Sequence, residues 1–286
     1  MTLARRSTSN SERTTAVNPL ARLLALDRPV VMGVLNVTPD SFSDGGRFFD
    51  PTTAIGHARR MVAEGADILD LGAESTRPYG GATAVPFEEE MRRLDPVLPT
   101  VLNLGVPVSI DTMKAKVAAA ALAAGAAIVN DVWGLQRDPD MARIVAEHAA
   151  PVLIMHNREA ADPRIDIMAD IHAFFVRSLA IADRAGITRE HIVLDPGIGF
   201  GKTPEQSLVA LARFAELKSF GLPLMIGASR KRFVDKVSPA PPDQRLGGSL
   251  AAHLAAVASG AVIVRTHDVA ETVQALRVAA AIRSAR

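Results

Sequence analysis

Cysteine is absent from this sequence of 286 residues. Disulfide bonds, thiolate zinc sites and cysteine nucleophiles are therefore excluded, and the composition fits a reducing cytosol, so a cytoplasmic protein is expected. Aromatic residues are scarce, with one tryptophan and one tyrosine. The formal net charge is only +1, so the chain has no overall field that would attract nucleic acid or an anionic membrane surface. Any anion must be held by a local cluster of charges.

Long hydrophobic runs are also missing. The longest apolar stretch, residues 117–129, is dominated by alanine and is shorter than the roughly 20 residues that a membrane span needs. The first two dozen residues are rich in Ser, Thr and Arg and lack the continuous apolar centre of a signal peptide. We predict a flexible N-terminal tail over residues 1–28 and one folded unit over residues 29–286.

Short apolar segments alternate with longer helical segments along the chain. The apolar segments are 29–36, 66–72, 106–111, 126–131, 151–156, 191–197, 223–229 and 261–267. The expected helices are 52–64, 87–104, 114–124, 139–149, 167–185, 204–219, 245–259 and 269–283. This order indicates parallel strands buried on both faces and predicts an α/β protein with a single (β/α)8 TIM barrel. A doubly wound open sheet is the alternative, because local pattern does not determine closure.

Polar residues follow each predicted strand, which is where a barrel of this class builds its active site. They are Asn36, residues 74–77, Asp111, Asn130, Asp131, His156, Asn157, Asp195, residues 230–232, Arg265 and His267. We predict the active site at the C-terminal ends of the strands.

Three of these residues form an acceptor set. Asp111, Asn130 and Asp195 offer several hydrogen-bond acceptors and few donors, which suits a flat heterocycle with a guanidine-like edge. The alternative makes Asp111 a helix cap and Asp195 a turn former.

A second set is basic and follows the last two strands, where barrels often bind phosphate. Lys231, Arg265 and His267 can donate to a phosphorylated substrate, whereas Arg230 and Arg232 could equally be surface cations. The stretch DPGIGFGKT is not a P-loop, because only three residues separate Gly197 from Gly201. The seven histidines show no paired spacing, so no transition-metal site is expected.

In chain order the motifs read GVLNVTPDSFSDGG, GAESTRP, SIDT, VNDV, MH, DPGIGFGKT, GASRKRF and RTHDV. This series resembles the ordered motifs of the dihydropteroate synthases of folate biosynthesis, from about residue 29 to the last helix. The resemblance implies a transferase that condenses (7,8-dihydropterin-6-yl)methyl diphosphate with 4-aminobenzoate by an SN1-like substitution and releases pyrophosphate, with Mg2+ as cofactor. It also implies a homodimer and a target of sulfonamides, with no nucleic-acid or membrane partner.

The family's site residues carry over onto matching positions. The resemblance implies pterin contacts from Asp111, Asn130, Met155, Asp195, Phe200, Gly227 and Lys231. It implies pyrophosphate contacts from Asn36, Arg265 and His267, with Asn36 also beside the metal, and aminobenzoate contacts from Phe42, Thr76, Arg77, Pro78 and Lys231. Asp111, Asp195, Lys231 and Arg265 are the expected catalytic residues, and Phe42 is expected to lie on a loop that closes over the arylamine.

Three segments depart from the family pattern. Residues 79–81 lengthen the second loop, Arg232 stands where many relatives have a small hydroxyl residue, and MHNREAADPRID lacks the commoner Gly and Pro. A pterin-binding methyltransferase that acts with a corrinoid protein would share the barrel and its carboxylates, but would not be expected to keep TPDSFSDGG, ESTRP and SRK together. An inactive paralogue would bind pterin without turnover.

Overall fold

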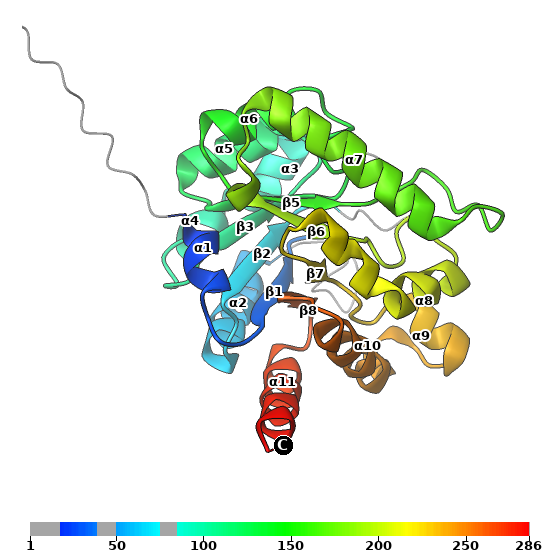
Figure 1. Ribbon diagram of the computed structural model, residues 1–286. Coiled ribbons are helices and arrows are strands. Elements are labelled where there is room, and N and C mark those ends of the chain that lie inside the picture. The colour runs from blue at the N-terminus through cyan, green and yellow to red at the C-terminus, as the bar shows by residue number, and fades with distance from the viewer. Residues whose placement is uncertain (1–17, 39–49, 75–84, 286) are drawn as a thin grey trace, which may run out of the picture.

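The computed structural model describes residues 18–38, 50–74 and 85–285, and Figure 1 shows its strands surrounded by helices. The strands are β1 (Val30–Asn36), β2 (Ile68–Gly72), β3 (Val108–Asp111), β4 (Ile128–Asp131), β5 (Val152–Met155), β6 (Ile192–Asp195), β7 (Met225–Ile226) and β8 (Ile263–Thr266). Each lies within a segment that the sequence predicts as a strand.

Eleven α-helices surround these strands within the described residues. They are α1 (Pro19–Leu24), α2 (Pro51–Glu64), α3 (Phe87–Leu94), α4 (Leu98–Val101), α5 (Ala115–Ala124), α6 (Met141–Glu147), α7 (Ile167–Ala185), α8 (Pro204–Ala212), α9 (Arg232–Val237), α10 (Leu246–Ala258) and α11 (Val269–Ser284). Short 3-10 segments are η1 (Arg189–His191), η2 (Phe214–Phe220) and η3 (Pro242–Gln244). No described helix is long and apolar enough to cross a membrane.

Two of the expected helices are interrupted. The helix expected over residues 87–104 divides into α3 and α4, because Pro96 and Pro99 interrupt the helical backbone hydrogen bonds. The helix expected over residues 204–219 ends at Ala212 and continues as η2. At its start, Thr203 and Gln206 form a reciprocal capping box, so the threonine of the GKT segment caps helix α8.

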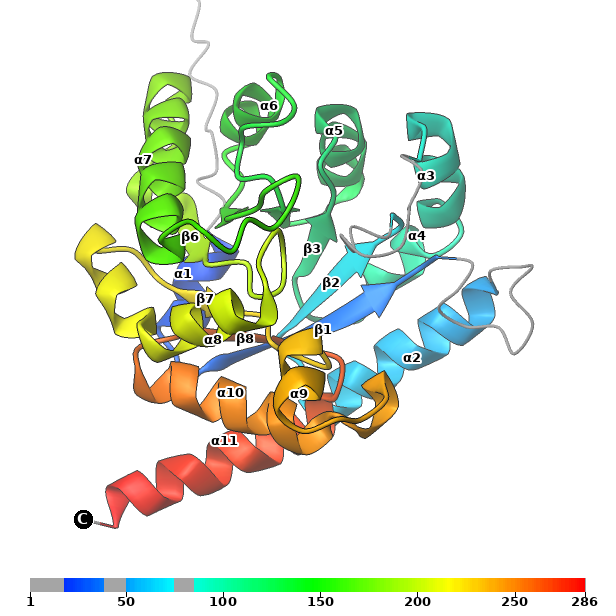
Figure 2. The same cartoon turned by 90° about the vertical axis from the view of Figure 1, so that its right-hand side faces the viewer.

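The strands form a barrel. All neighbours run parallel in the order β6-β5-β4-β3-β2-β1-β8-β7. The first strand pairs with the last, with Val31 opposite Val264, and a parallel bridge between Leu194 and Leu224 joins β6 to the start of β7. We call this single-bridge junction the seam. Figure 2 shows helices around the outside of these strands, so the barrel prediction is confirmed and the open sheet is wrong.

The N-terminal end of the barrel is filled by an apolar cluster that we call the floor. It consists of Leu20, Val30, Met32, Ile68, Ile128, Leu153, Val193, Met225 and Ile263. Leu20 belongs to α1 and is fully buried, and the side chain of Asn18 caps this helix. The predicted tail is therefore wrong for residues 18–28, because apolar burial fixes α1 against the barrel. Residues 1–17 lie outside the described part of the chain.

Candidate active site

The side chains that face the inside of the barrel change from apolar to mostly polar toward the C-terminal ends of the strands. Alternate residues of a strand face the same side. The floor residues Ile128, Leu153, Val193, Met225 and Ile263 are followed two positions later by Asn130, Met155, Asp195, Gly227 and Arg265. We call these five residues, together with Asp70 and Asp111, the inward layer. The strands thus bring together most of the residues predicted for the pterin, at the C-terminal end of the barrel.

Arg265 is held between two carboxylates of the inward layer. Its Nε donates to Asp70 Oδ2 at 2.6 Å, and its Nη2 donates to Asp111 Oδ2 at 2.7 Å. Burial alone would lower the pKa of Arg265, but the charges of Asp70 and Asp111 raise it overall. The guanidinium predicted to hold pyrophosphate therefore also organises the acids of the neighbouring pocket.

The aspartates of the inward layer are buried from solvent. Burial raises the pKa of Asp111 to about 7, against the opposing charge of Arg265. Burial also raises the pKa of Asp195, which Lys231 opposes. Asp111 Oδ1 and Asn130 Oδ1 are buried with no hydrogen-bond partner among the described residues. Because buried acceptors are costly when unpaired, this pocket fits a ligand that presents donors.

The alternative roles of these acids can be compared with the local bonds. Asp111 does not cap the next helix, because the Ala115 amide at the start of α5 donates to Asp138 instead, at 2.8 Å. Asp195 does stabilise a turn, since its Oδ1 accepts from the Gly197 amide at 2.8 Å. A Cβ at Gly227 would lie 3.7 Å from the other oxygen of Asp195. Asp195 therefore combines the turn with a place in the inward layer.

Lys231 lies beside the loop that follows β6. Its ammonium donates to the carbonyl of Ile198 and lies 4.5 Å from the centre of the Phe200 ring. Burial lowers the pKa of Lys231 to about 7, although Asp195 opposes the shift. The structure thus places two predicted pterin contacts, Lys231 and Phe200, against each other.

The residues after β7 and β8 separate into two roles. His267 Nδ1 lies 3.0 Å from Ser229 Oγ, which fixes the orientation of the ring. Arg230 forms an ion pair with Asp268, its Nε lying 3.0 Å from Oδ2, and Arg232 begins the short helix α9 at the surface. His267 directly follows β8, two positions after Arg265, whereas Arg230 joins two loops.

Other polar residues at the strand ends have partners outside the inward layer. Glu74 binds the ammonium of Lys114 and the Val85 amide. Asp131 closes a turn by accepting from the amide of Leu135 at 2.6 Å. Position at the end of a strand therefore did not by itself identify a site residue, because alternate positions face outward.

Several predictions concern segments outside the described residues. Phe42, Thr76, Arg77 and Pro78 lie there, as does the longer loop at residues 79–81, so their aminobenzoate roles stay predictions. Asn36 is described at the C-terminal end of β1, where it is partly exposed. The described residues contain no cluster of three or more His, Cys, Asp or Glu side chains suited to a metal.

Two functional candidates were not predicted from the sequence. The first is Asp70, whose Oδ2 also accepts from Asn130 Nδ2 at 2.9 Å. The available signal was a lone acid inside the apolar segment ILDLG, because such a charge needs a buried partner.

The second is Lys202, the lysine of the GKT segment. It is fully buried, and its ammonium donates to the carbonyls of Gly197 at 2.9 Å and Phe200 at 3.1 Å. It also lies 2.6 Å from Nδ1 of His156, whose Nε2 lies 2.9 Å from Asp170. Burial lowers the pKa of Lys202 well below its usual value. Lys202 thus holds the loop that carries Phe200, which agrees with rejecting a P-loop.

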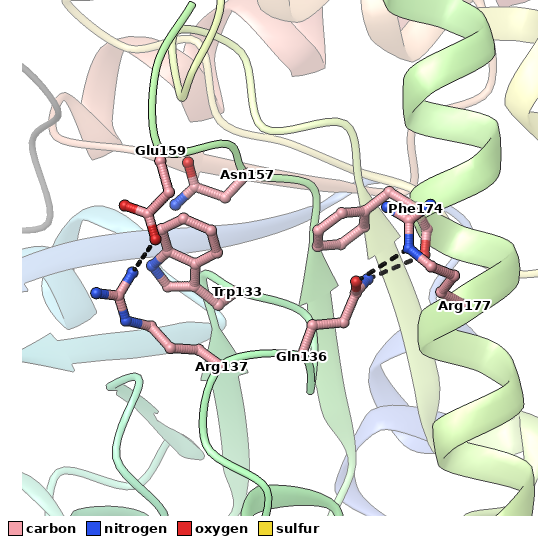
Figure 3. A pocket seen from close by; sticks show the side chains of 7 residues that line it. All are labelled: Trp133, Gln136, Arg137, Asn157, Glu159, Phe174 and Arg177. Carbon is pink, nitrogen blue, oxygen red and sulfur yellow. Dashed lines mark hydrogen bonds and ion pairs between the residues drawn. The ribbon is translucent and has the colours of Figure 1, made fainter.

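A hollow of about 550 Å³ lies between the loops after β4 and β5 and helix α7 (Figure 3). It is lined by Trp133, Gln136, Arg137, Asn157, Glu159, Phe174 and Arg177. Arg137 binds Glu159 at 3.0 Å and lies over the Trp133 ring, while Gln136 donates to Ser178 at 2.8 Å. Several of these side chains bind one another, and of the polar residues predicted at the strand ends only Asn157 is among those that line the hollow. It is therefore distinct from the inward layer.

Together, the fold and site define a (β/α)8-barrel protein with an acceptor-rich pocket next to a cationic strand end. Comparison with known proteins is consistent with this class. Residues 32–267 match the model of the pterin binding enzyme family. The dihydropteroate synthase of Bacillus subtilis (strain 168) is 44% identical over 244 residues, which cover 85% of each chain.

Solved structures agree in fold and sequence. A Clostridium difficile dihydropteroate synthase determined with pteroic acid has 48% identity and a TM-score of 0.85, covering 90% of this chain and 97% of that one. A Xanthomonas albilineans dihydropteroate synthase in complex with 7,8-dihydropteroate has 42% identity and a TM-score of 0.82, covering 90% and 95%. The chain belongs to the dihydropteroate synthase family of pterin-binding enzymes.

Proposed function

We propose that this protein condenses (7,8-dihydropterin-6-yl)methyl diphosphate with 4-aminobenzoate to give 7,8-dihydropteroate and pyrophosphate. The observation that carries the proposal is the inward layer, in which buried acceptors of Asp111 and Asn130 lie beside the guanidinium of Arg265. The bound 7,8-dihydropteroate of the Xanthomonas albilineans relative supports the same product.

The two halves of the substrate would meet different sides of the site. The donor edge of the pterin faces Asp111, Asn130 and Asp195, with Met155, Phe200 and Gly227 as walls. The diphosphate lies toward Arg265, His267 and Asn36. This division is supported by the pairing of β1 with β8, which places Asn36 on the strand next to the one that carries Arg265 and leads into His267.

The reaction exchanges a carbon–oxygen bond for a carbon–nitrogen bond. The bond between the exocyclic methylene and the diphosphate breaks first, and its electron pair leaves with the diphosphate. Buried carboxylates at Asp111 and Asp195 stabilise the cation that the pterin ring delocalises. The neutral amine of 4-aminobenzoate then attacks the methylene and releases a proton to water. Lys231 would support the pterin and the aminobenzoate from the side of Phe200.

Magnesium remains a proposal for this chain. Mg2+ prefers oxygen ligands, keeps several waters and commonly binds substrate phosphates rather than a cage of protein groups. The side-chain oxygen of Asn36 fits that requirement, with the diphosphate supplying the other ligands. When bound, the ion would neutralise charge on the departing pyrophosphate.

The function is tested by measuring pyrophosphate release from the purified protein with and without 4-aminobenzoate, and by identifying 7,8-dihydropteroate by mass spectrometry. We expect release that depends on 4-aminobenzoate. Release without it, or none, would overturn the proposal. A pterin-binding methyltransferase or an inactive paralogue would show no such release, although either could bind a pterin.

Replacing Arg265 by Ala tests the anion site. We expect binding of the pterin diphosphate to weaken far more than binding of a pterin without phosphate, because only the former loses a charge-assisted contact. Arg230→Ala is a matched control, since Arg230 pairs with Asp268 rather than with the inward layer. Equal losses for the two pterins in Arg265→Ala would remove the anion assignment.

We further propose a cytoplasmic homodimer. A diphosphate does not cross a bilayer unaided, so the enzyme must share a compartment with the source of its substrate. Figures 1 and 2 show α11 extending away from the barrel, and its Val278 and Ile282 are 55% and 62% exposed, which supports pairing through this helix. Light scattering of wild type and Ile282→Glu tests this, and an unchanged mass would exclude this interface.

A further inference from the structure

Asp70 is a fully buried carboxylate in the middle of β2. It lies opposite Val34 of β1 and Ser109 of β3 in the strand register. A buried charge is costly unless it is paired and hydrogen-bonded. The partners of Asp70 therefore indicate what it does.

A single oxygen of Asp70 accepts from two donors on different strands. Oδ2 lies 2.9 Å from Asn130 Nδ2 and 2.6 Å from Arg265 Nε. In the strand order, β2 is two strands away from both β4 and β8. Asp70 thus joins a predicted pterin contact to a predicted pyrophosphate contact.

The hydrogen bond to Asp70 also fixes the orientation of the Asn130 side-chain amide. An ionised carboxylate only accepts hydrogen bonds, so Asn130 must turn its NH2 group toward Asp70 and its carbonyl oxygen the other way. That oxygen is buried without a partner among the described residues, as is Oδ1 of Asp111. With Asp70 in place, both side chains present acceptors to the pocket.

We propose that Asp70 is a positioning residue that sets the hydrogen-bond polarity of the pterin pocket and holds Arg265 for the diphosphate. It acts through its hydrogen bonds to Asn130 and Arg265. The proposal rests on the proposed function, and it explains why the pocket takes a heterocycle with a donor edge rather than one with an acceptor edge.

Asp70→Asn tests this with little change of shape. The new side chain is neutral, so the hydrogen bond from Asn130 is no longer charge-assisted and Arg265 loses one charge partner. We expect the dissociation constants of 6-hydroxymethylpterin and of inorganic pyrophosphate, and the Michaelis constant for the pterin diphosphate, each to rise about tenfold or more. The Michaelis constant for the arylamine substrate should change by less than about twofold.

Ser109→Ala is the matched control. Ser109 lies opposite Asp70, is fully buried, and its hydroxyl has no hydrogen-bond partner among the described residues. We expect wild-type constants for all ligands. A general disturbance of the barrel would lower the amount of active protein in both variants without this selective rise in pterin and pyrophosphate constants.

Wild-type binding of both probes by Asp70→Asn would overturn the proposal. If this variant does not fold, the smaller Asp70→Ser is measured in its place, and the same selective loss is expected; its absence overturns the proposal. A wild-type protein that forms no dihydropteroate would refute the proposed function separately, because the Asp70 measurements use direct binding.

Discussion

Burial controls the protonation of the side chains that face the barrel interior. Asp111 and Lys231 are displaced from their ordinary pKa values in opposite directions and both approach about 7, because loss of water disfavours either charge. Two groups of opposite charge that titrate near neutrality make the pocket sensitive to pH.

Lys231 should determine the alkaline limit of activity. Its ammonium is present below a pKa of about 7 and is lost as the pH rises through that value, so kcat/KM should fall above neutrality if the charge is needed. Lys231→Arg keeps its charge and should shift the alkaline fall to higher pH, even if its maximum rate is lower. A pH profile of kcat/KM checks this, with Lys236→Arg as an exposed control. An unchanged alkaline limb would contradict the role of Lys231.

His253 should make the fold sensitive to acid. Both ring nitrogens are buried without a hydrogen-bond partner in the described part of the chain, and burial lowers the pKa from 6.5 to about 4. The unfolded chain therefore takes up the proton first, and stability is lost as the pH falls from about 6.5 toward 4.

Replacing His253 by Leu removes this titration. The loss in the free energy of unfolding between about pH 7.5 and about pH 5 should shrink by about 2 kcal/mol. Urea denaturation at the two pH values measures it, and the exposed His148→Leu should leave the difference unchanged. If the free energy of unfolding falls by the same amount between the two pH values in His253→Leu and wild type, the ring is not buried in a neutral form.

The sequence identified the inward layer only partly. Asn130, Asp195 and Arg265 could be predicted because each ends an apolar segment. The pairing of Arg265 with Asp70 could not, since 195 positions separate the two residues and only barrel closure brings them together.

At the scale of elements, the alternation of apolar and helical segments predicted every strand found in the described residues. It did not predict α1 or α9, which have six residues each. A helix of six residues has fewer than two turns, which is too short for an apolar repeat to be recognised in the sequence. Helix α1 depends on tertiary burial for its stability.

Helix α1 should contribute substantially to stability. Leu20→Ala removes a fully buried side chain from the floor and should lower the free energy of unfolding by about 3 kcal/mol. Leu26→Ala is the control, because Leu26 is 39% exposed and should cost less than about 0.5 kcal/mol. Chemical denaturation compares them, and similar losses would mean that α1 is not docked in solution.

Across the whole molecule, the number of backbone pairs between neighbouring strands differs around the barrel. β1 and β2 share five residue pairs in register, whereas the seam has one bridge. Closure of the barrel could not be deduced from the local sequence pattern. The pairing of Leu194 with Leu224 at the seam depends on how all the other strands are arranged.

The seam should open more often than the other strand junctions. We expect the amides of Met225 and Ile226 to exchange with deuterium faster than those of β2. Pteroic acid should slow that exchange, because Asp195 before the seam and Lys231 after it are both predicted pterin contacts. Hydrogen exchange with mass spectrometry measures this, and uniform protection of all strands would exclude a weak seam.

The seam also separates the acidic residues of the pocket from its basic residues in the order of the chain. Asp70, Asp111 and Asp195 precede it, whereas Lys231 and Arg265 follow it. A chain cut between Gly221 and Leu222 would therefore yield two fragments of complementary charge. The four residue pairs between β8 and β1 would guide their reassembly, and the substrate would bridge them. The barrel could then serve as a split reporter whose reconstitution depends on its own pterin.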